Sequence, residues 1–248
     1  MSVAYTLDNA RPVQIGLVAL QADETIERDM RALLPDDVEY MVSRVPSGTT
    51  VTPDTLREMA HNLTAAAALF PRGANMACVG YGCTSGAAEI GSDRIAQLVQ
   101  AGIPTGHVTD PVTSLIAACR TLNIKRLGLL SPYIESVSDK LRMVLRAAGI
   151  DVAAFASFDE PVEERVVRIS IDSIVHAARD LGTYADVDAL FLSCTNLRTL
   201  EAIPQIEDLR NIPVLSSNLV LAWHMAELAG IRLRTNLTFE LARVALKT

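Results

Sequence analysis

Short apolar segments alternate along the whole chain with segments in which apolar residues recur at helical spacing. Both kinds of segment are bounded by polar and turn-forming residues, as expected for alternating strands and helices. The predicted strands are Val13–Leu20, Val38–Val45, Met76–Tyr81, Thr105–Val108, Arg126–Leu130, Val152–Phe155, Ala189–Ser193 and Val214–Ser216. The predicted helices are Asp23–Leu34, Pro53–Leu69, Ser92–Ala101, Val112–Leu122, Ile134–Ala148, Ile169–Leu181, Arg198–Glu207 and Leu219–Leu228. This alternation is typical of parallel βαβ units with right-handed crossovers.

The pattern occurs twice. Residues 14–18 (QIGLV) are echoed by residues 126–130 (RLGLL), and the strand-opening segment 102–104 (GIP) is echoed by 211–213 (NIP). The sequence therefore predicts an α/β fold of two pseudo-symmetric lobes, each a four-stranded parallel sheet flanked by helices. We expect residues 1–117 with 220–248 to form the first lobe and residues 118–219 to form the second.

The composition narrows the class of protein. The chain has 248 residues, half of them hydrophobic, and can bury a large core. Its net charge of −7 argues against nucleic acid as a partner. No apolar run approaches the roughly 20 residues that span a membrane, and Met1–Arg11 lacks the pattern of a signal peptide. We expect a cytoplasmic protein that does not bind membranes.

Two Cys-Thr pairs stand at matching points of the repeat, each at the end of a predicted strand. One begins the segment Cys83-Thr84-Ser85 and the other the segment Cys194-Thr195-Asn196. Ligands of open α/β sheets bind outside the carboxyl ends of the strands, so facing lobes would place both thiols in one crevice. Backbone N–H groups of such turns would lower the thiol pKa and bind a carboxylate. The alternative is a small buried side chain, which we expect for Cys78 and Cys119.

Two further polar residues follow predicted strands. Asp23 comes after the first strand, and it either caps the next helix or places a carboxylate at the mouth of the crevice. Tyr133 comes after the strand at 126–130, where its hydroxyl either reaches a ligand or only packs at a turn. The four cysteines form no Cys-x-x-Cys pair and the four histidines are scattered, so no metal site is predicted.

With these motifs, the chain resembles the aspartate/glutamate racemase superfamily, and within it the branch of maleate cis-trans isomerases and arylmalonate decarboxylases. The resemblance covers nearly the whole chain. It implies an enzyme without a cofactor, with its site between the lobes and a small carboxylate as substrate. It also implies that Cys83 and Cys194 are the catalytic thiols and that Tyr133 contacts the substrate. The side chains implied to bind a substrate carboxylate are Thr84, Ser85, Thr195 and Asn196. The segments that carry the resemblance are Gly16-Leu17-Val18, Gly82-Cys83-Thr84-Ser85, Ser131-Pro132-Tyr133 and Ser193-Cys194-Thr195-Asn196-Leu197-Arg198.

One position departs from the isomerases of this branch. They are similar to one another in carrying Asn after the first strand, where the nearest matching residue here is Asp23. A carboxylate would repel a dicarboxylate substrate, whereas the amino-acid racemases of the superfamily do carry an acidic residue there. The Asp-Glu-Thr turn also resembles that of proteins encoded with ectoine-degradation enzymes. This resemblance implies a substrate with an amine, such as a diaminobutyrate-type acid.

The leading hypothesis is racemisation or epimerisation of a small carboxylic acid, in particular an amino acid, by two opposed cysteines. The first alternative is cis-trans isomerisation of maleate by cysteine addition. The second is decarboxylation, although the decarboxylases of the family lack a cysteine at the position of Cys83. The third is a metabolite-binding protein without catalysis. The oligomeric state stays open, and a homo-oligomer is one of its alternatives.

Overall fold

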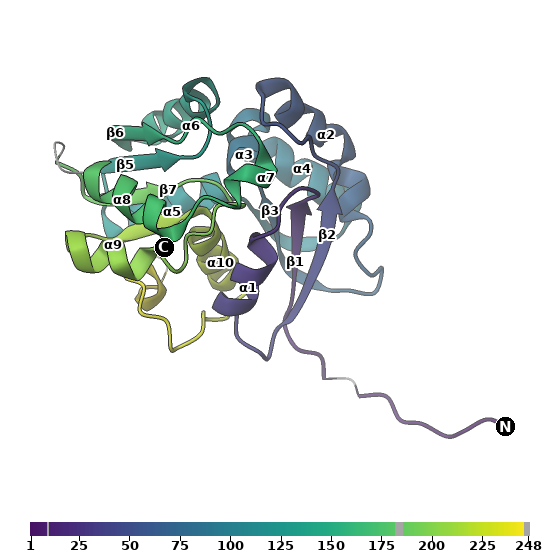
Figure 1. Cartoon of the computed structure of the whole chain (residues 1–248). Helices are drawn as coiled ribbons and strands as arrows, with labels where there is room; N and C mark the ends of the chain where they lie inside the picture. Colours follow the sequence, from purple (N-terminus) through teal and green to yellow (C-terminus); the bar gives the residue numbers. More distant parts are fainter. Residues whose placement is uncertain (9, 182–185, 246–248) are drawn as a thin grey trace.

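The computed structural model describes residues 1–8, 10–181 and 186–245 of the chain. Within them the strands form two separate parallel sheets, each with helices packed around it (Figure 1). The first sheet has the order β2-β1-β3-β4 and the second the order β6-β5-β7-β8. The two orders are equivalent, which confirms the predicted pair of pseudo-symmetric lobes. The strands are β1 (Gln14–Leu20), β2 (Glu39–Val45), β3 (Met76–Gly82), β4 (Thr105–Thr109), β5 (Arg126–Ser131), β6 (Asp151–Ser157), β7 (Ala189–Leu192) and β8 (Val214–Ser216).

The central strands of each sheet are mostly apolar, which suits strands that helices cover on both faces. Every residue of β1 and of β7 is buried, whereas the edge strand β6 is mostly half-buried. The helices are α1 (Ile26–Leu33), α2 (Pro53–Ala67), α3 (Thr84–Ile90), α4 (Ser92–Gly102), α5 (Pro111–Leu122), α6 (Glu135–Ala147), α7 (Glu163–Val166), α8 (Ile171–Leu181), α9 (Ile203–Arg210) and α10 (Ser217–Leu228), with a 3₁₀ turn at Leu241–Arg243.

Helix α10 packs where the two lobes meet. It directly follows β8 of the second sheet and packs against β3 of the first sheet and against α1 and α5. Its residues from Ser217 to Ala226 are all buried, as expected of a helix that is apolar on every side. The indole N–H of Trp223 donates to the carbonyl oxygen of Val244 at 2.9 Å and fixes the C-terminal segment against this helix.

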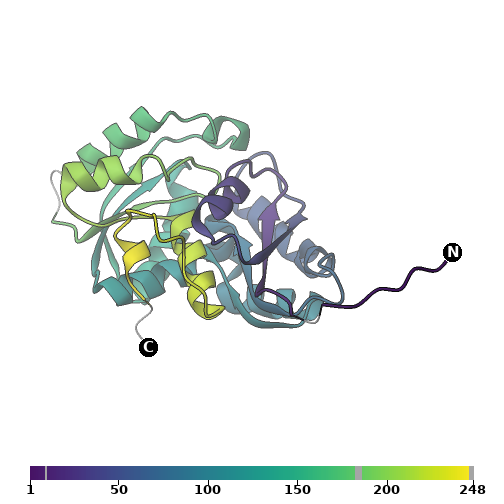
Figure 2. The same ribbon diagram turned by 90° about the horizontal axis from the view of Figure 1, so that it is seen from below.

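The structure places both lobes around α10, and the lobe boundaries at 117 and 220 remain our proposal. Parts of the proposed ranges, residues 182–185 and 246–248, lie outside the described part of the chain. The N-terminal segment extends away from both lobes (Figure 2). Within the described ranges, no helix has the length and apolar character needed to cross a membrane.

The prediction missed two short helices and placed the start of a third too early. Helix α3 was missed because it is short and built of small residues without an apolar period, and α7 was missed because it has only four residues. The helix predicted over Arg198–Glu207 begins at Ile203 instead, with Pro204 in its first turn, where the missing N–H is not needed. The residues before it, 198–202, are not helical, and the bend that follows Cys194 lies at residues 195–197.

We expect Gly102→Ala to destabilise the first lobe by about 1–3 kcal/mol, because a new Cβ would overpack the contact of α4 with α2. That Cβ would lie 2.4 Å from the carbonyl oxygen of Thr64 and 2.7 Å from the Cβ of Ala67. The free energy of unfolding in urea measures the effect. Gly73→Ala is the control, since a Cβ there meets no atom within 4 Å. Equal stability of the two variants would contradict this packing argument.

Candidate active site

All eight predicted site residues line one pocket between the lobes. They come from the carboxyl ends of β1, β3, β5 and β7, the two central strands of each sheet. The pocket is closed around a cavity of only about 10 Å³, which is room for about one water molecule. A substrate therefore requires the pocket to open. The lining residues are Leu20, Asp23, Val51, Leu56, Cys83, Thr84, Ser85, Tyr133, Glu163, Cys194, Thr195 and Asn196.

Cys83 is the N-cap residue of α3. Its Sγ accepts a hydrogen bond from the backbone N–H of Gly86 at 3.1 Å, in the way that a serine oxygen caps a helix. Gly86 is required at this point, since a Cβ there would lie 2.6 Å from the hydroxyl oxygen of Tyr81 and 2.9 Å from the sulfur of Cys83. The first thiol is thus fixed by local helix geometry and by close packing beneath it.

Cys194 is held in a conformation that is rare for a residue with a side chain. Its φ angle is +97°, a strained value of the kind that surrounding contacts must enforce. Its N–H donates to the hydroxyl oxygen of Ser217 at 3.0 Å, and its Sγ accepts from the N–H of Asn196 at 3.3 Å. The hydroxyl oxygen of Tyr133 lies 2.9 Å from the same sulfur. The second thiol therefore has a phenol as its immediate neighbour.

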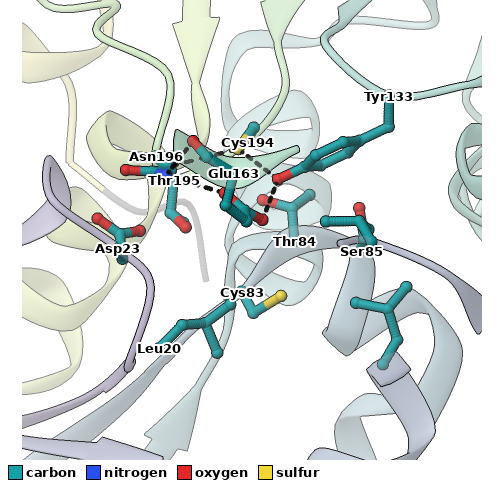
Figure 3. Close-up of a pocket in the computed structure, with 12 residues that line it drawn as sticks. Leu20, Asp23, Cys83, Thr84, Ser85, Tyr133, Glu163, Cys194, Thr195 and Asn196 are labelled. Atoms are coloured by element: carbon teal, nitrogen blue, oxygen red, sulfur yellow. Dashed lines mark hydrogen bonds between the residues drawn. The ribbon is translucent and has the colours of Figure 1, made fainter. Parts of the chain in front are cut away.

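Glu163 is a pocket residue that the sequence analysis missed. The hydroxyl of Tyr133 donates to its Oε1 at 2.7 Å, and Nδ2 of Asn196 donates to its Oε2 at 2.9 Å. Figure 3 shows Glu163, Tyr133 and Cys194 joined in one group, with Cys83 set apart from it. In the sequence, Glu163 belongs to an acidic pair after a proline, a pattern typical of an exposed loop, and nothing local signals its burial.

A contact between the two lobes brings Glu163 into the pocket. The loops that follow β2 and β6 meet through an antiparallel bridge between Thr50 and Val162. The N–H of Glu163 donates to the carbonyl oxygen of Thr49 at 3.2 Å, and the N–H of Val51 donates to that of Pro161 at 3.1 Å. These loops supply two lining residues, Val51 and Glu163, one from each lobe.

Asp23 caps a helix and also lines the pocket, the two positions that the sequence analysis offered as alternatives. Its Oδ1 accepts from the backbone N–H groups of Thr25 and Ile26, both at 2.8 Å, and so caps the start of α1. Its Oδ2 is buried and accepts no hydrogen bond of normal geometry from the described residues, and the hydroxyl of Thr195, which acts on this carboxyl group and lowers its pKa, donates to Gly82 instead. One oxygen is structural, and the other is available to a ligand.

Polar contacts across the lobes connect the turns after β3 and β7 with the start of α10. The hydroxyl oxygen of Ser217 accepts from the hydroxyl of Thr84 at 2.7 Å as well as from Cys194. The hydroxyl of Thr195 donates to the carbonyl oxygen of Gly82 at 3.2 Å. Nδ2 of Asn218 donates to the carbonyl oxygen of Thr195 and to Oδ2 of Asp29, each at 2.8 Å. Ser217, Asn218 and Asp29 are therefore supporting residues that the sequence motifs did not reveal.

The prediction of thiols with a lowered pKa is wrong for this closed pocket. Burial raises the pKa of Cys83 to about 12 and that of Cys194 well above its ordinary value. The N–H of Gly86 lowers the pKa of Cys83 and the hydroxyl of Tyr133 lowers that of Cys194, but burial outweighs both, and the carboxyl groups of Glu163 and Asp23 raise the pKa of both thiols further. Burial also raises the pKa of Asp23 and of Glu163. Burial therefore favours the neutral thiol at both cysteines.

The site holds no evident place for a metal ion. Among the described residues, no three or more His, Cys, Asp or Glu side chains are grouped so that they could bind one. The chemistry that the arrangement can perform is that of thiols, a phenol and carboxyl groups in a dry pocket.

The fold and the site define a class of protein with two α/β lobes and one cysteine from each lobe in a shared pocket. Comparison of the chain with known proteins then identifies its family. The family model of arylmalonate decarboxylase matches residues 15–241. The chain therefore belongs to the arylmalonate decarboxylase family, which confirms the predicted branch of the superfamily.

Individual relatives come from both sides of this branch. The chain is 29% identical to arylmalonate decarboxylase of Bordetella bronchiseptica, over 58% of this chain and 60% of that protein. It is 24% identical to maleate isomerase of Geobacillus stearothermophilus, over 84% and 88%. A mutant of Nocardia farcinica maleate cis-trans isomerase with a covalently bound succinylcysteine intermediate has the same fold, with a TM-score of 0.79, 23% identity, and coverage of 89% of this chain and 94% of that one. The chain is therefore similar both to a decarboxylase and to maleate isomerases, and it shares the fold of the latter.

We expect Ser217→Ala to destabilise the protein by about 1–3 kcal/mol, because it leaves the buried N–H of Cys194 and the hydroxyl of Thr84 without an acceptor. Urea unfolding measures the loss. Ser136→Ala on the exposed side of α6 is the control, with an expected change within about 0.5 kcal/mol. A Ser217→Ala variant as stable as that control would show that the hydroxyl does not support the turns.

We expect Asp29→Asn to stabilise the protein at pH 8 by about 1–3 kcal/mol and to have little effect near pH 4. Burial raises the pKa of Asp29 to about 6, so the native protein loses stability as the pH rises from about 4 to about 6 and this carboxyl group ionises. Asparagine keeps the oxygen that accepts from Asn218 and carries no charge. Urea unfolding at both pH values tests this, with Asp139→Asn on the surface as the control. An equal effect of Asp29→Asn at the two pH values would contradict the assignment.

Proposed function

We propose that this chain is a cofactor-independent isomerase of a small carboxylic acid, with Cys83 and Cys194 as its reacting groups. The observation that carries this proposal is the position of the two thiols, which come from equivalent strands of the two lobes and line the same closed pocket. A thiol can act as an acid, a base or a nucleophile. Two thiols on opposite sides of one small molecule therefore suit an isomerisation, in which substrate and product have the same composition.

The surroundings of the two thiols suggest different roles. Cys83 accepts an N–H bond at the start of a helix, which favours its negatively charged form, and we assign to it the role of nucleophile or base. Cys194 lies beside the hydroxyl of Tyr133, through which a proton can be replaced, and we assign to it the role of proton donor.

The relatives favour cis-trans isomerisation of an unsaturated acid. The thiolate of Cys83 would form a C–S bond to one alkene carbon, and the electron pair of the double bond would move toward the substrate carboxylate. Rotation about the resulting single bond and expulsion of the thiolate would restore the double bond in the other geometry. If Cys194 also gave a proton to the second alkene carbon, the adduct would be a saturated thioether, of the kind of the succinylcysteine in the mutant isomerase of Nocardia farcinica, and Cys194 would take that proton back before the thiolate of Cys83 is expelled.

The second candidate is racemisation, and Asp23 favours it. Here one thiolate takes the proton from the α-carbon while the opposite thiol gives a proton to the other face. The free Oδ2 of Asp23 is suited to hold the ammonium group of an amino acid. Decarboxylation, in contrast, needs one proton donor and leaves the second buried thiol without a role.

Proton NMR in D₂O distinguishes these reactions in one experiment. We expect the wild-type protein to change the alkene signals of a cis acid to those of the trans acid, or to exchange the α-proton of an amino acid for deuterium. Cys83→Ser and Cys194→Ser should each reduce either activity by at least about 100-fold, as is typical of a lost acid-base group. Cys119→Ser, a buried cysteine on α5 away from the pocket, is the control and should stay active. Full activity in either pocket variant would refute the two-thiol mechanism.

A further inference from the structure

The pocket with the two thiols contains two carboxyl groups and no cationic side chain. Of its twelve described lining residues, Asp23 and Glu163 are acidic and none is Lys, Arg or His. Both acidic side chains are buried, with 3% and 5% of the residue surface exposed. Arg44 is the cation that acts on Asp23, but its guanidinium group donates to backbone carbonyls, including that of Asp23, and is absent from the lining. A dianion entering this pocket would meet negative charge without a counter-charge.

Glu163 occupies the donors that a second substrate carboxylate would need. Tyr133 and Asn196 were expected to contact the substrate, and both donate to Glu163 instead. The amide of Asn196 has two N–H groups, and Nδ2 donates both to Oε2 of Glu163 and to its carbonyl oxygen, the latter at 3.2 Å. The carboxyl group of the protein thus stands where these side chains would otherwise bind a carboxyl group of a diacid.

Asp23 presents the opposite situation, an acceptor without a donor. Its Oδ2 is buried against the pocket and accepts no hydrogen bond of normal geometry, since the nearby hydroxyl of Thr195 donates to Gly82, while its Oδ1 accepts from two N–H groups. A buried carboxylate oxygen that lacks a donor is costly, so a ligand that supplies one is favoured. A protonated amine supplies up to three N–H donors together with the missing positive charge.

We propose that the substrate is a small monocarboxylic acid that carries a protonated amine, with Asp23 binding the amine and Glu163 taking the place of the second carboxylate of a diacid. This inference rests on the proposed function, since it assigns the substrate class of the same pocket. The substrate carboxylate then falls to Ser85, whose hydroxyl lines the pocket and has no hydrogen bond among the described residues.

A bound amine also makes the thiols easier to ionise. Both carboxyl groups raise the pKa of Cys83 and of Cys194, in addition to the effect of burial. A cation beside Asp23 offsets part of that negative charge, so a thiolate forms at a lower cost with the substrate in place. A dicarboxylate substrate would have the opposite effect and would hold both thiols neutral.

Calorimetric titration of the full-length protein with matched pairs of ligands tests the substrate class. The first pair is succinate and 4-aminobutanoate, which differ in a carboxylate against an aminomethyl group. The second pair is maleate and cis-4-aminobut-2-enoate, which differ in the same way. We expect the amino acid of each pair to bind at least about tenfold more tightly than the diacid. Equal or tighter binding of the diacids would overturn the proposal.

Two variants assign the preference to its residues. Asp23→Asn keeps an oxygen for the cap of α1 and removes the charge, and it should reduce the preference for the amino acids by about tenfold or more. Glu163→Gln should strengthen binding of succinate and maleate. Glu24→Gln and Glu164→Gln, at exposed neighbouring positions, are the matched controls and should leave the preference unchanged. A preference that survives both pocket variants, or falls equally in the controls, would overturn the assignment.

The substrate class and the reaction are tested separately, because calorimetric titration measures binding and does not require the enzyme to turn the ligand over. If the amino acids bind preferentially and no isomerisation is detected, the substrate class stands and the proposed function fails. If maleate is isomerised faster than cis-4-aminobut-2-enoate, the proposed function stands and the substrate class fails. Cys83→Ser should retain the preference for the amino acids, since this thiol contacts neither carboxyl group through a hydrogen bond.

Discussion

The start of α10 is the point on which both halves of the site depend. The hydroxyl oxygen of Ser217 accepts one hydrogen bond from Thr84 of the first lobe and one from the N–H of Cys194 of the second. The helix behind it is buried from Ser217 to Ala226, so that its position is set by apolar packing against both lobes. Because one residue of a rigidly packed helix holds both turns, the relative position of the two thiols follows from where that helix begins.

Desolvation is the second constraint on the site. The closed pocket excludes water from two thiols and two carboxyl groups, and burial raises the pKa of all four. Burial therefore disfavours the charged form of each of these groups, and a positively charged ligand would favour it. Such an arrangement protects thiols from oxidants and solvent, since the thiolate is the reactive form.

The thiols and the carboxyl groups of the pocket occupy different parts of the scaffold. The thiols sit at the ends of β3 and β7, which are central strands of rigid sheets. Asp23 belongs to the loop after β1, and Glu163 is the first residue of the short helix α7, directly after the loop that follows β6. Loops tolerate substitution better than central strands do. The chain's relatives include a decarboxylase and maleate isomerases, and the segments that carry Asp23 and Glu163 are places where such proteins can differ without a change of fold.

The amino-acid sequence by itself determined the two sheets and the position of both thiols, because apolar periodicity and the Cys-Thr turns are local signals. It did not reveal Glu163, since the burial of that side chain depends on a bridge between Thr50 and Val162, far apart in the chain. It also suggested lowered thiol pKa values, because N–H donors of a turn are visible locally whereas desolvation is not. Only the tertiary structure decided how the lobes meet around the pocket. This contact brings the carboxyl group of Glu163 beside the thiols and shields the thiols from solvent.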